Sequence, residues 1–137
     1  MIGYVTLGTN NLPRAVAFYD ALFGAMGGKR FMEHEGVFVA WVTDPKGAGL
    51  SVTKPFNGQP ATVGNGVMVA LDAPNPAEVD RLHALALSLG ATDEGAPGMR
   101  GGGFYAAYFR DPDGNKLNFF CFAGEYARPV PGSAGDD

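Results

Sequence analysis

A hairpin-like segment that occurs twice is the feature that most constrains the fold. Residues 104–122 read FYAAYFRDPDGNKLNFFCF, two apolar runs on either side of Asp111-Pro112-Asp113-Gly114. Proline presets φ at the second turn position and glycine accepts the left-handed conformation that closes the turn, so the segment predicts a β-hairpin. Residues 38–52 (FVAWVTDPKGAGLSV) repeat it, with Ser51 on Asn118 and Leu50 on Leu117. The chain therefore contains the same unit twice.

The segments before each hairpin also correspond. Residues 2–8 and 66–71 alternate as strands do, and each is followed by an asparagine and a proline that suit a helix start. Apolar residues then recur at helical spacing until Gly24 in the first half and Gly90 in the second. Further strands are predicted in the first half at 29–34, 37–43 and 50–54, and in the second at 91–94 and in the hairpin.

This order predicts an α+β fold built from two βαβββ modules, at about residues 1–54 and 65–123. One module alone would bury too little apolar surface, so the two are expected to pair curved mixed sheets around a central cavity. Small-molecule sites prefer such junctions. Residues 124–137 lack periodicity, and we expect them to form a loose C-terminal tail.

Composition limits the partners. The 137 residues are 46% hydrophobic, which suits one domain, and the net charge of −4 comes with scattered lysines and arginines, so nucleic acid is not an expected partner. No apolar run approaches the ~20 residues that cross a bilayer. Cys121 is the only cysteine, so no internal disulfide forms, and a cytoplasmic location is expected.

At this point the pattern resembles the vicinal oxygen chelate superfamily, which includes glyoxalase I, bleomycin-resistance proteins and extradiol dioxygenases. The matching stretches are YVTLGTNN, LPRAVAFYDALFGAMG and FYAAYFRDPDGNKLNFF, and the resemblance covers residues 1–123 as a single glyoxalase/bleomycin-resistance-like domain. It implies paired βαβββ modules enclosing a cavity, often in a homodimer. It does not fix the activity, because this family hosts isomerases, dioxygenases, thiol transferases and binding proteins.

Enzymes of this family hold a divalent metal through His, Gln or Glu in the first and last strands of each module. The resemblance places these positions at Tyr4, Ser51, Gly66 and Asn118. None is a histidine or carboxylate, and phenol, hydroxyl and amide groups bind zinc, nickel or iron poorly. We therefore expect no catalytic metal at the usual position and no other cofactor.

A ligand site is predicted instead. Strand alternation places Tyr4, Ser51 and Asn118 on the cavity side, as polar groups among aromatic ones that could hold a small, partly apolar molecule. The repeat pairs Trp41 with Tyr108 and Phe38 with Tyr105, but it does not show which pair faces inward. The aromatic residues fill the core or line the site, with equal support for each. The catalytic residues are unassigned.

Other residues favour structural roles. His34 beside a turn and His83 on a helix flank are interpreted as surface histidines, and Cys121 as a buried apolar group. The glycine-rich segment 95–103 is interpreted as a connector, with a lid over the cavity as the alternative.

Two further functions remain open from sequence. One is a glyoxalase-like lyase, isomerase or dioxygenase that uses a non-standard metal set, or metal-free acid–base chemistry at Tyr4 or Glu94. The other is a module whose cavity is filled by its own side chains.

Overall fold

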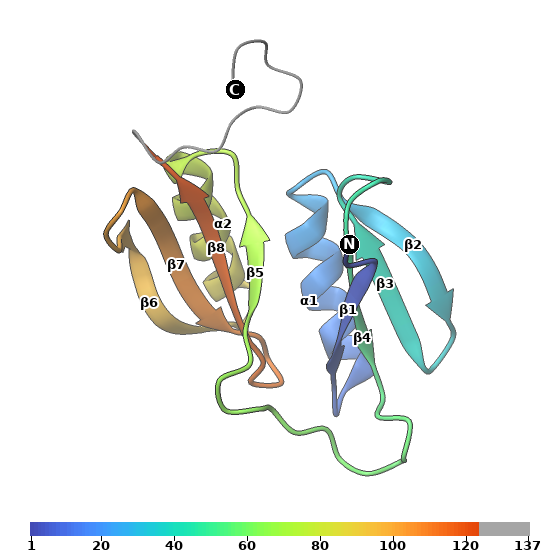
Figure 1. Ribbon diagram of the computed structural model, residues 1–137. Coiled ribbons are helices and arrows are strands. Elements are labelled where there is room, and N and C mark those ends of the chain that lie inside the picture. The colour runs from blue at the N-terminus through green and yellow to red at the C-terminus, as the bar shows by residue number, and fades with distance from the viewer. Residues whose placement is uncertain (124–137) are drawn as a thin grey trace.

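A computed structural model describes residues 1–123, and the predicted tail at 124–137 lies outside the described residues. Two four-stranded mixed sheets, each covered by one helix, confirm the predicted α+β fold of two βαβββ modules (Figure 1). The first module contains β1 (Tyr4–Gly8), α1 (Leu12–Gly24), β2 (Lys29–His34), β3 (Phe38–Val42) and β4 (Gly49–Thr53). The second contains β5 (Val69–Asp72), α2 (Pro76–Ser88), β6 (Thr92–Met99), β7 (Phe104–Arg110) and β8 (Lys116–Phe122).

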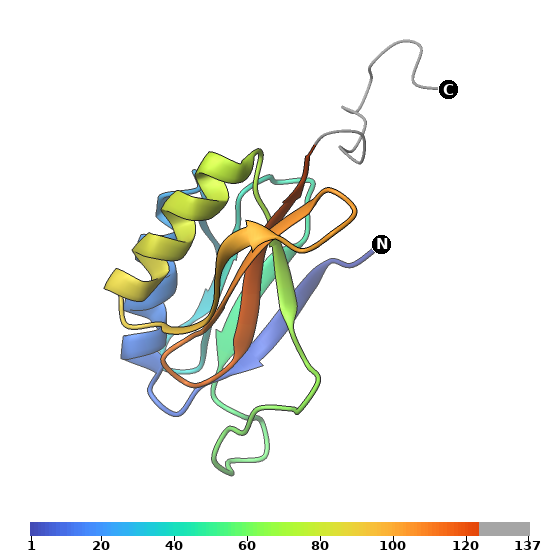
Figure 2. The ribbon, with the colours of Figure 1, turned by 90° about the vertical axis from the view of Figure 1, so that its left-hand side faces the viewer.

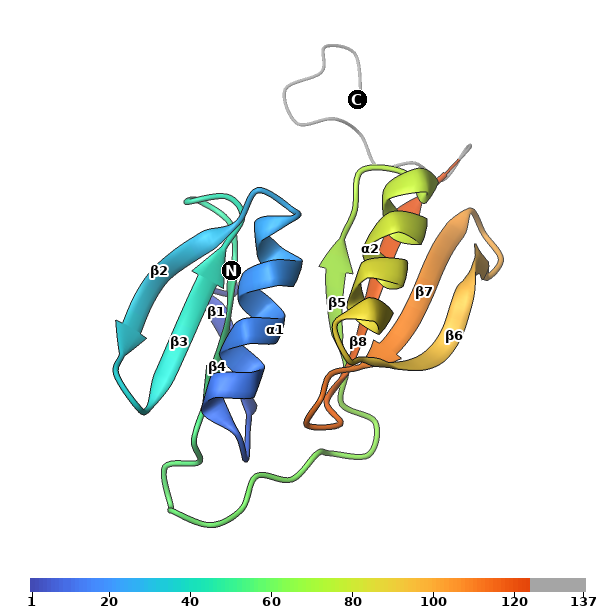
Figure 3. The same cartoon turned by 180° about the vertical axis from the view of Figure 1, so that it is seen from behind.

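Both sheets have the same topology. The strand orders are β1-β4-β3-β2 and β5-β8-β7-β6; the first strand of each module runs parallel to its last, and the remaining pairs are antiparallel. β1 and β5 are therefore edge strands, and they face one another across the middle of the molecule (Figures 1 and 3). The two sheets do not join into a closed barrel.

The helices begin where the sequence predicts. Asn11 caps α1 by accepting a hydrogen bond from the Arg14 backbone N–H at 3.1 Å, and Asn75 caps α2 through Glu78 N–H at 2.9 Å. A proline occupies the first turn of each helix. Figure 2 shows both helices on the same side of the two sheets, so the opposite faces of both sheets carry no helix.

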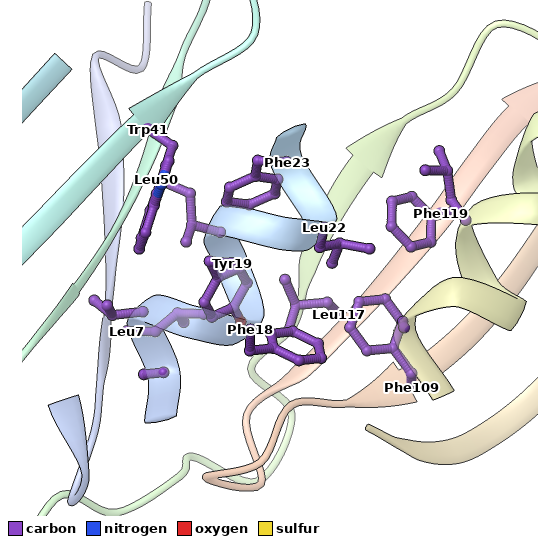
Figure 4. Close-up of a cluster of buried hydrophobic side chains, with 14 of the residues drawn as sticks. Leu7, Phe18, Tyr19, Leu22, Phe23, Trp41, Leu50, Phe109, Leu117 and Phe119 are labelled. Carbon is purple, nitrogen blue, oxygen red and sulfur yellow. The ribbon is translucent and has the colours of Figure 1, made fainter. Parts of the chain in front are cut away.

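The modules share one hydrophobic core on the helix side of the sheets (Figure 4). Phe18 of α1 lies against Phe109 of β7, with ring centroids 6.5 Å apart, and in the close-up Leu22 points toward Phe119 and Leu117. The other side of α1 packs against its own sheet, where the Tyr19 and Trp41 rings are 5.6 Å apart. Since α1 is apolar toward both sheets, the first module cannot bury its helix alone.

A network of hydrogen bonds, here called the polar joint, connects the two modules at the turn between β7 and β8. Asp111 Oδ1 accepts hydrogen bonds from the backbone N–H groups of Asp113 and Asn115, both at 2.9 Å, which fixes the turn. Asp111 Oδ2 accepts a hydrogen bond from the phenol of Tyr19 in the first module at 2.7 Å. Asn115 Nδ2 donates to the Gly8 carbonyl at 3.0 Å. The turn that identifies the hairpin is thus also the contact that joins the modules.

The side chain of Asp113 extends the joint toward the start of α1. Its Oδ1 accepts hydrogen bonds from the Asn10 backbone N–H at 3.0 Å and from the Arg14 guanidinium at 3.1 Å. The carboxylate is buried while the arginine is half exposed. A carboxylate placed at the positive end of a helix gains further stabilisation from the helix dipole.

Two predicted strand boundaries are wrong by three residues or more. β5 begins at Val69 rather than at Gly66, and β6 continues to Met99 rather than ending at 94. Two irregularities in the pairing of β6 with β7, between Asp93 and Gly95 and between Gly95 and Gly98, accommodate the residues that do not suit a regular strand. The segment 95–103 is therefore mostly strand, neither a lid nor a plain connector.

The repeat also shifts by one residue within each hairpin. Residues 43–48 connect β3 to β4, whereas the shorter 111–115 connect β7 to β8. Ala40 pairs with Ser51, and Tyr108 pairs with Asn118. Tyr108 therefore corresponds to Ala40, and the predicted equivalence of Tyr108 with Trp41 is wrong.

Candidate functional site

A pocket of ≈ 490 Å³ lies between the two modules. Edge strands β1 and β5 provide opposite walls, through Val5 on one side and Ala70 on the other. Phe23 and Met26, at the end of α1, and Trp41 of β3 contribute large apolar surfaces. The lining also includes residues of two edge strands, and edge strands in general present backbone N–H and C=O groups that can bind a ligand. The pocket is thus lined mainly by apolar side chains, with few polar groups.

Trp41 is the predicted site residue that lines this pocket. It is 2% exposed, and its Nε1 donates a hydrogen bond to Asp20 Oδ1 at 2.8 Å. Asp20 is held in turn by Arg30, at 2.6 Å between Nη2 and Oδ2. The Arg30 hydrogen bond, assisted by that of Trp41, lowers the pKa of Asp20, so the carboxylate that orients the indole stays ionised. The indole is therefore fixed before any ligand arrives.

Ser51 and Asn118 occupy equivalent positions on the faces that carry no helix. Ser51 lies between Thr6 and Ala40 in strand register, and Asn118 between Ala70 and Tyr108. Both are buried, and neither Asn118 Nδ2 nor Asn118 Oδ1 has a hydrogen-bond partner among residues 1–123. A buried amide without partners costs on the order of 1–3 kcal/mol, which makes Asn118 unusual.

Tyr4 shares the face of Ser51 but is 52% exposed. Tyr4, Ser51 and Asn118 are not among the residues that line the pocket. Their convergence on one ligand remains a prediction.

The two predicted tyrosines of β7 lie on opposite faces. Tyr108 pairs with Asn118 and shares its face, whereas Tyr105 pairs with Cys121 on the helix side. The Tyr105 phenol donates a hydrogen bond to Asp80 of α2 at 2.6 Å. Of these two, Tyr108 is therefore the one that faces away from the helices.

The fourth family position is corrected by the strand register. Tyr4 lies two residues before Thr6, the partner of Ser51, and Met68 lies two residues before Ala70, the partner of Asn118. Met68 therefore takes the place assigned to Gly66. A phenol, a hydroxyl, a thioether and an amide do not fit zinc, nickel or iron. No group of three His, Cys, Asp or Glu suited to a metal occurs within residues 1–123.

His83 is not on the surface, which corrects the sequence interpretation. It is 4% exposed, and its Nε2 lies 3.1 Å from the Tyr108 carbonyl oxygen and 3.2 Å from Asp93 Oδ1. Because the carbonyl can only accept, Nε2 carries the proton and ties α2 to β6 and β7. This flank of α2 faces β6 and β7 rather than solvent, which the helix periodicity alone does not reveal. His34, at the end of β2, is exposed as expected.

Two other titratable residues are accounted for structurally. Cys121 is buried as expected, and burial raises the pKa of its thiol, which disfavours the reactive thiolate. Glu94, the alternative acid–base residue, forms an ion pair with Arg110. The hydrogen bond from Arg110 lowers the pKa of Glu94, which opposes a role as a proton donor.

Comparisons with known proteins agree with this architecture. A model of the Glyoxalase/Bleomycin resistance protein/Dioxygenase superfamily matches residues 1–119. No protein with a curated description matches the chain. Within residues 1–123, no helix has the length and apolar character needed to span a membrane.

Solved structures match closely. A glyoxalase/bleomycin resistance protein from Albidiferax ferrireducens T118 is 37% identical, with a TM-score of 0.79 over 88% of this chain and 97% of that one. Lactoylglutathione lyase from Agrobacterium tumefaciens is 25% identical, with a TM-score of 0.67 over 88% and 92% of the two chains. A family enzyme from Burkholderia phytofirmans PsJN, at 19% identity and a TM-score of 0.71 over 88% and 98%, shares the fold.

Proposed function

This chain belongs to the Glyoxalase/Bleomycin resistance protein/Dioxygenase superfamily, and from that premise we propose that it binds a small, partly apolar molecule between its modules without the family's usual metal. The observation that carries the proposal is the pocket of ≈ 490 Å³ between β1 and β5. This volume lies within the ~300–1,000 Å³ typical of small-molecule sites. Binding there would draw on Trp41 and Phe23 for apolar contact.

The side chains at the four positions where the family holds its metal support a role in binding a small molecule. Tyr4, Ser51, Met68 and Asn118 can make hydrogen bonds or apolar contacts, but they provide neither an imidazole nor a carboxylate. The proposed site comprises the pocket together with Ser51, Asn118 and the neighbouring aromatic side chains. Tyr4 would contribute from the exposed start of β1.

The proposal includes a cytoplasmic homodimer. Its support is the apolar surface that this chain leaves exposed on and beside the first sheet, since isolated soluble domains seldom expose large apolar side chains together. These residues are Ile2, Tyr4, Phe31, Met32 and Met68.

Glyoxalase-like catalysis is the second candidate. It is favoured by the 25% identity with a lactoylglutathione lyase. In this case the domain at residues 1–123 would act as a lyase or an isomerase. Bound metal separates the metal-dependent form of this candidate from the binding proposal. Stoichiometric zinc, nickel, manganese or iron in protein purified without chelators, lost in Asn118→Leu, would overturn the binding proposal.

Trp41 provides a direct assay because it is the only tryptophan in the chain. A library of small apolar fragments is titrated while the Trp41 emission is recorded. Ala70→Leu narrows the pocket and is expected to weaken each hit by at least ~10-fold. The matched control is Ala84→Leu, because Ala84 is exposed on α2 and outside the pocket. Equal affinities in the two variants would contradict the site.

A further inference from the structure

A row of side chains extends from the pocket across the helix-free face of the second sheet. Ala70 of β5 forms a pocket wall and is the register partner of Asn118 on β8. Asn118 is in turn the partner of Tyr108 on β7. Register partners share a face and strands lie about 4.8 Å apart, so Tyr108 is on the order of 10 Å from the pocket wall. A ligand with its apolar part in the pocket needs little length to reach Tyr108.

Two cations lie over the Tyr108 ring. Arg100 Cζ is 5.5 Å and Lys116 Nζ is 5.4 Å from the ring centroid. Lys116 comes from β8 on one side of Tyr108, and Arg100 folds back over β6 on the other. A Cβ at Gly98 would lie 2.9 Å from Arg100 Nη1, and one at Gly95 would lie 3.1 Å from the Tyr108 ring. The glycines of β6 therefore make room for the guanidinium and the ring.

Within residues 1–123 neither cation forms a close ion pair with a carboxylate, although the charge of Lys116 helps the Arg110 hydrogen bond to lower the pKa of Glu94. The acceptor for Arg100 is the Ala96 carbonyl oxygen, at 2.5 Å from Nη2, and Lys116 forms no ion pair. Arg110, on the same face, is paired with Glu94. The region around Tyr108 is thus locally positive in a chain whose net charge is −4.

Asn118 provides an independent indication of a ligand. Its side chain is fully buried, its amide faces the same side of the sheet as the Tyr108 ring, and both of its polar atoms lack partners. An amide N–H can donate to an anionic oxygen, and such charge-assisted hydrogen bonds are among the stronger ones. A polar ligand group would satisfy an atom that the described chain leaves unsatisfied.

We propose that the ligand is a small carboxylate whose anionic group binds over Tyr108, between Arg100 and Lys116, and accepts a hydrogen bond from Asn118 Nδ2. Its apolar part lies in the pocket beside Ala70. Because the Asn118 side chain is fully buried, binding requires neighbouring side chains to move, and the long side chains of Arg100 and Lys116 can move toward the carboxylate. This inference rests on the proposed function, because it gives the chemical class of the ligand for the same site.

The test compares 1-naphthoate with 1-naphthamide, which share an apolar body and differ in charge. Isothermal titration calorimetry is expected to show naphthoate binding at least ~10-fold more tightly, with a preference that shrinks as salt is added. Arg100→Met and Lys116→Met should each reduce that preference without changing the affinity for naphthamide. Lys29→Met is the matched control, because Lys29 is exposed on the outer strand of the other sheet and should leave both affinities unchanged.

The outcomes separate the inference from the function on which it rests. Equal affinities for the two probes, both weakened by Ala70→Leu, would overturn the carboxylate site and leave the pocket intact. A preference that survives the double variant Arg100→Met/Lys116→Met would also overturn it. Binding of neither probe would count against the site and the pocket together. Asn118→Leu should weaken naphthoate severalfold in a protein that still unfolds cooperatively; unchanged affinity would remove Asn118 from the site.

Discussion

The phenol of Tyr19 donates a hydrogen bond to Asp111 across the boundary between the modules, with 2.7 Å between the oxygens. Tyr19 is on α1 of the first module, and Asp111 begins the turn between β7 and β8 of the second. Both side chains are buried, so this bond cannot be replaced by water. The family's most recognisable turn therefore has a structural task at the module boundary.

Tyr19→Phe is expected to lower the free energy of unfolding by about 1.5–3 kcal/mol. The change removes a donor to a buried carboxyl group while keeping the ring contacts. Urea denaturation followed by circular dichroism measures it. Tyr4→Phe is the control, because Tyr4 is 52% exposed, and it should change the unfolding free energy by less than about 0.5 kcal/mol. If Tyr19→Phe lowers the free energy of unfolding no more than Tyr4→Phe does, the hydrogen bond from the Tyr19 hydroxyl does not stabilise the fold.

The carboxyl group of Asp111 should titrate above the ordinary aspartate pKa of 3.8. Burial raises its pKa, and hydrogen bonds from Tyr19 and Asn115 oppose part of this rise. Tyr19→Phe should therefore raise the Asp111 pKa further. The carboxyl carbon chemical shift, followed by NMR against pH, measures both values.

The consequence for stability has a defined sign. A raised native pKa means that the folded protein holds this proton more tightly than the unfolded chain does. The stability contributed by Asp111 is therefore complete below pH 3.8 and is lost as the pH rises through its native pKa. The difference in unfolding free energy between wild type and Asp111→Asn, measured across this window, should fall with rising pH. A difference in unfolding free energy that does not change with pH would contradict a raised pKa of Asp111 in the folded protein.

Asn118→Leu is expected to raise the free energy of unfolding by about 1–3 kcal/mol in ligand-free protein. The leucine has a similar volume and removes two buried polar atoms that have no partners among residues 1–123. Asn115→Leu is the matched control and should destabilise, because Asn115 Nδ2 donates to Gly8 and to Asp111, each at 3.0 Å. Destabilisation in Asn118→Leu as well, measured by urea denaturation, would show that this amide has partners in solution.

Gly49→Ala should destabilise the protein by about 1–3 kcal/mol. A Cβ at this position would lie 2.8 Å from the Trp41 carbonyl oxygen, a backbone atom of the adjacent strand, and 2.8 Å from Phe31 Cε1. Gly24→Ala is the comparison, because a Cβ there meets nothing within 4 Å and alanine favours the last turn of α1. Thermal melts should show a lower midpoint for the first variant and an equal or higher one for the second.

Several features of the fold were predictable because their causes are local. The asparagine caps, the early prolines and the apolar periodicity give the two helices, and the Asp-Pro-x-Gly turns give the two hairpins. The repeat placed Ser51 and Asn118 in equivalent positions, as the strand register confirms. The stretch at 95–99 was misread because glycine and proline indicate a loop locally, whereas pairing with β7 keeps it extended.

The sequence by itself determined the elements, the repeat and the absence of histidine or carboxylate at the four family positions. The tertiary structure decided which faces meet: it buried His83 under β6, corrected Gly66 to Met68, and brought Tyr19 to Asp111 across the two modules. It also placed Trp41 in the pocket and Tyr108 beside Asn118. The reason is physical: caps, turns and periodicity act over a few residues, whereas pockets and buried partners depend on packing between segments far apart in the chain.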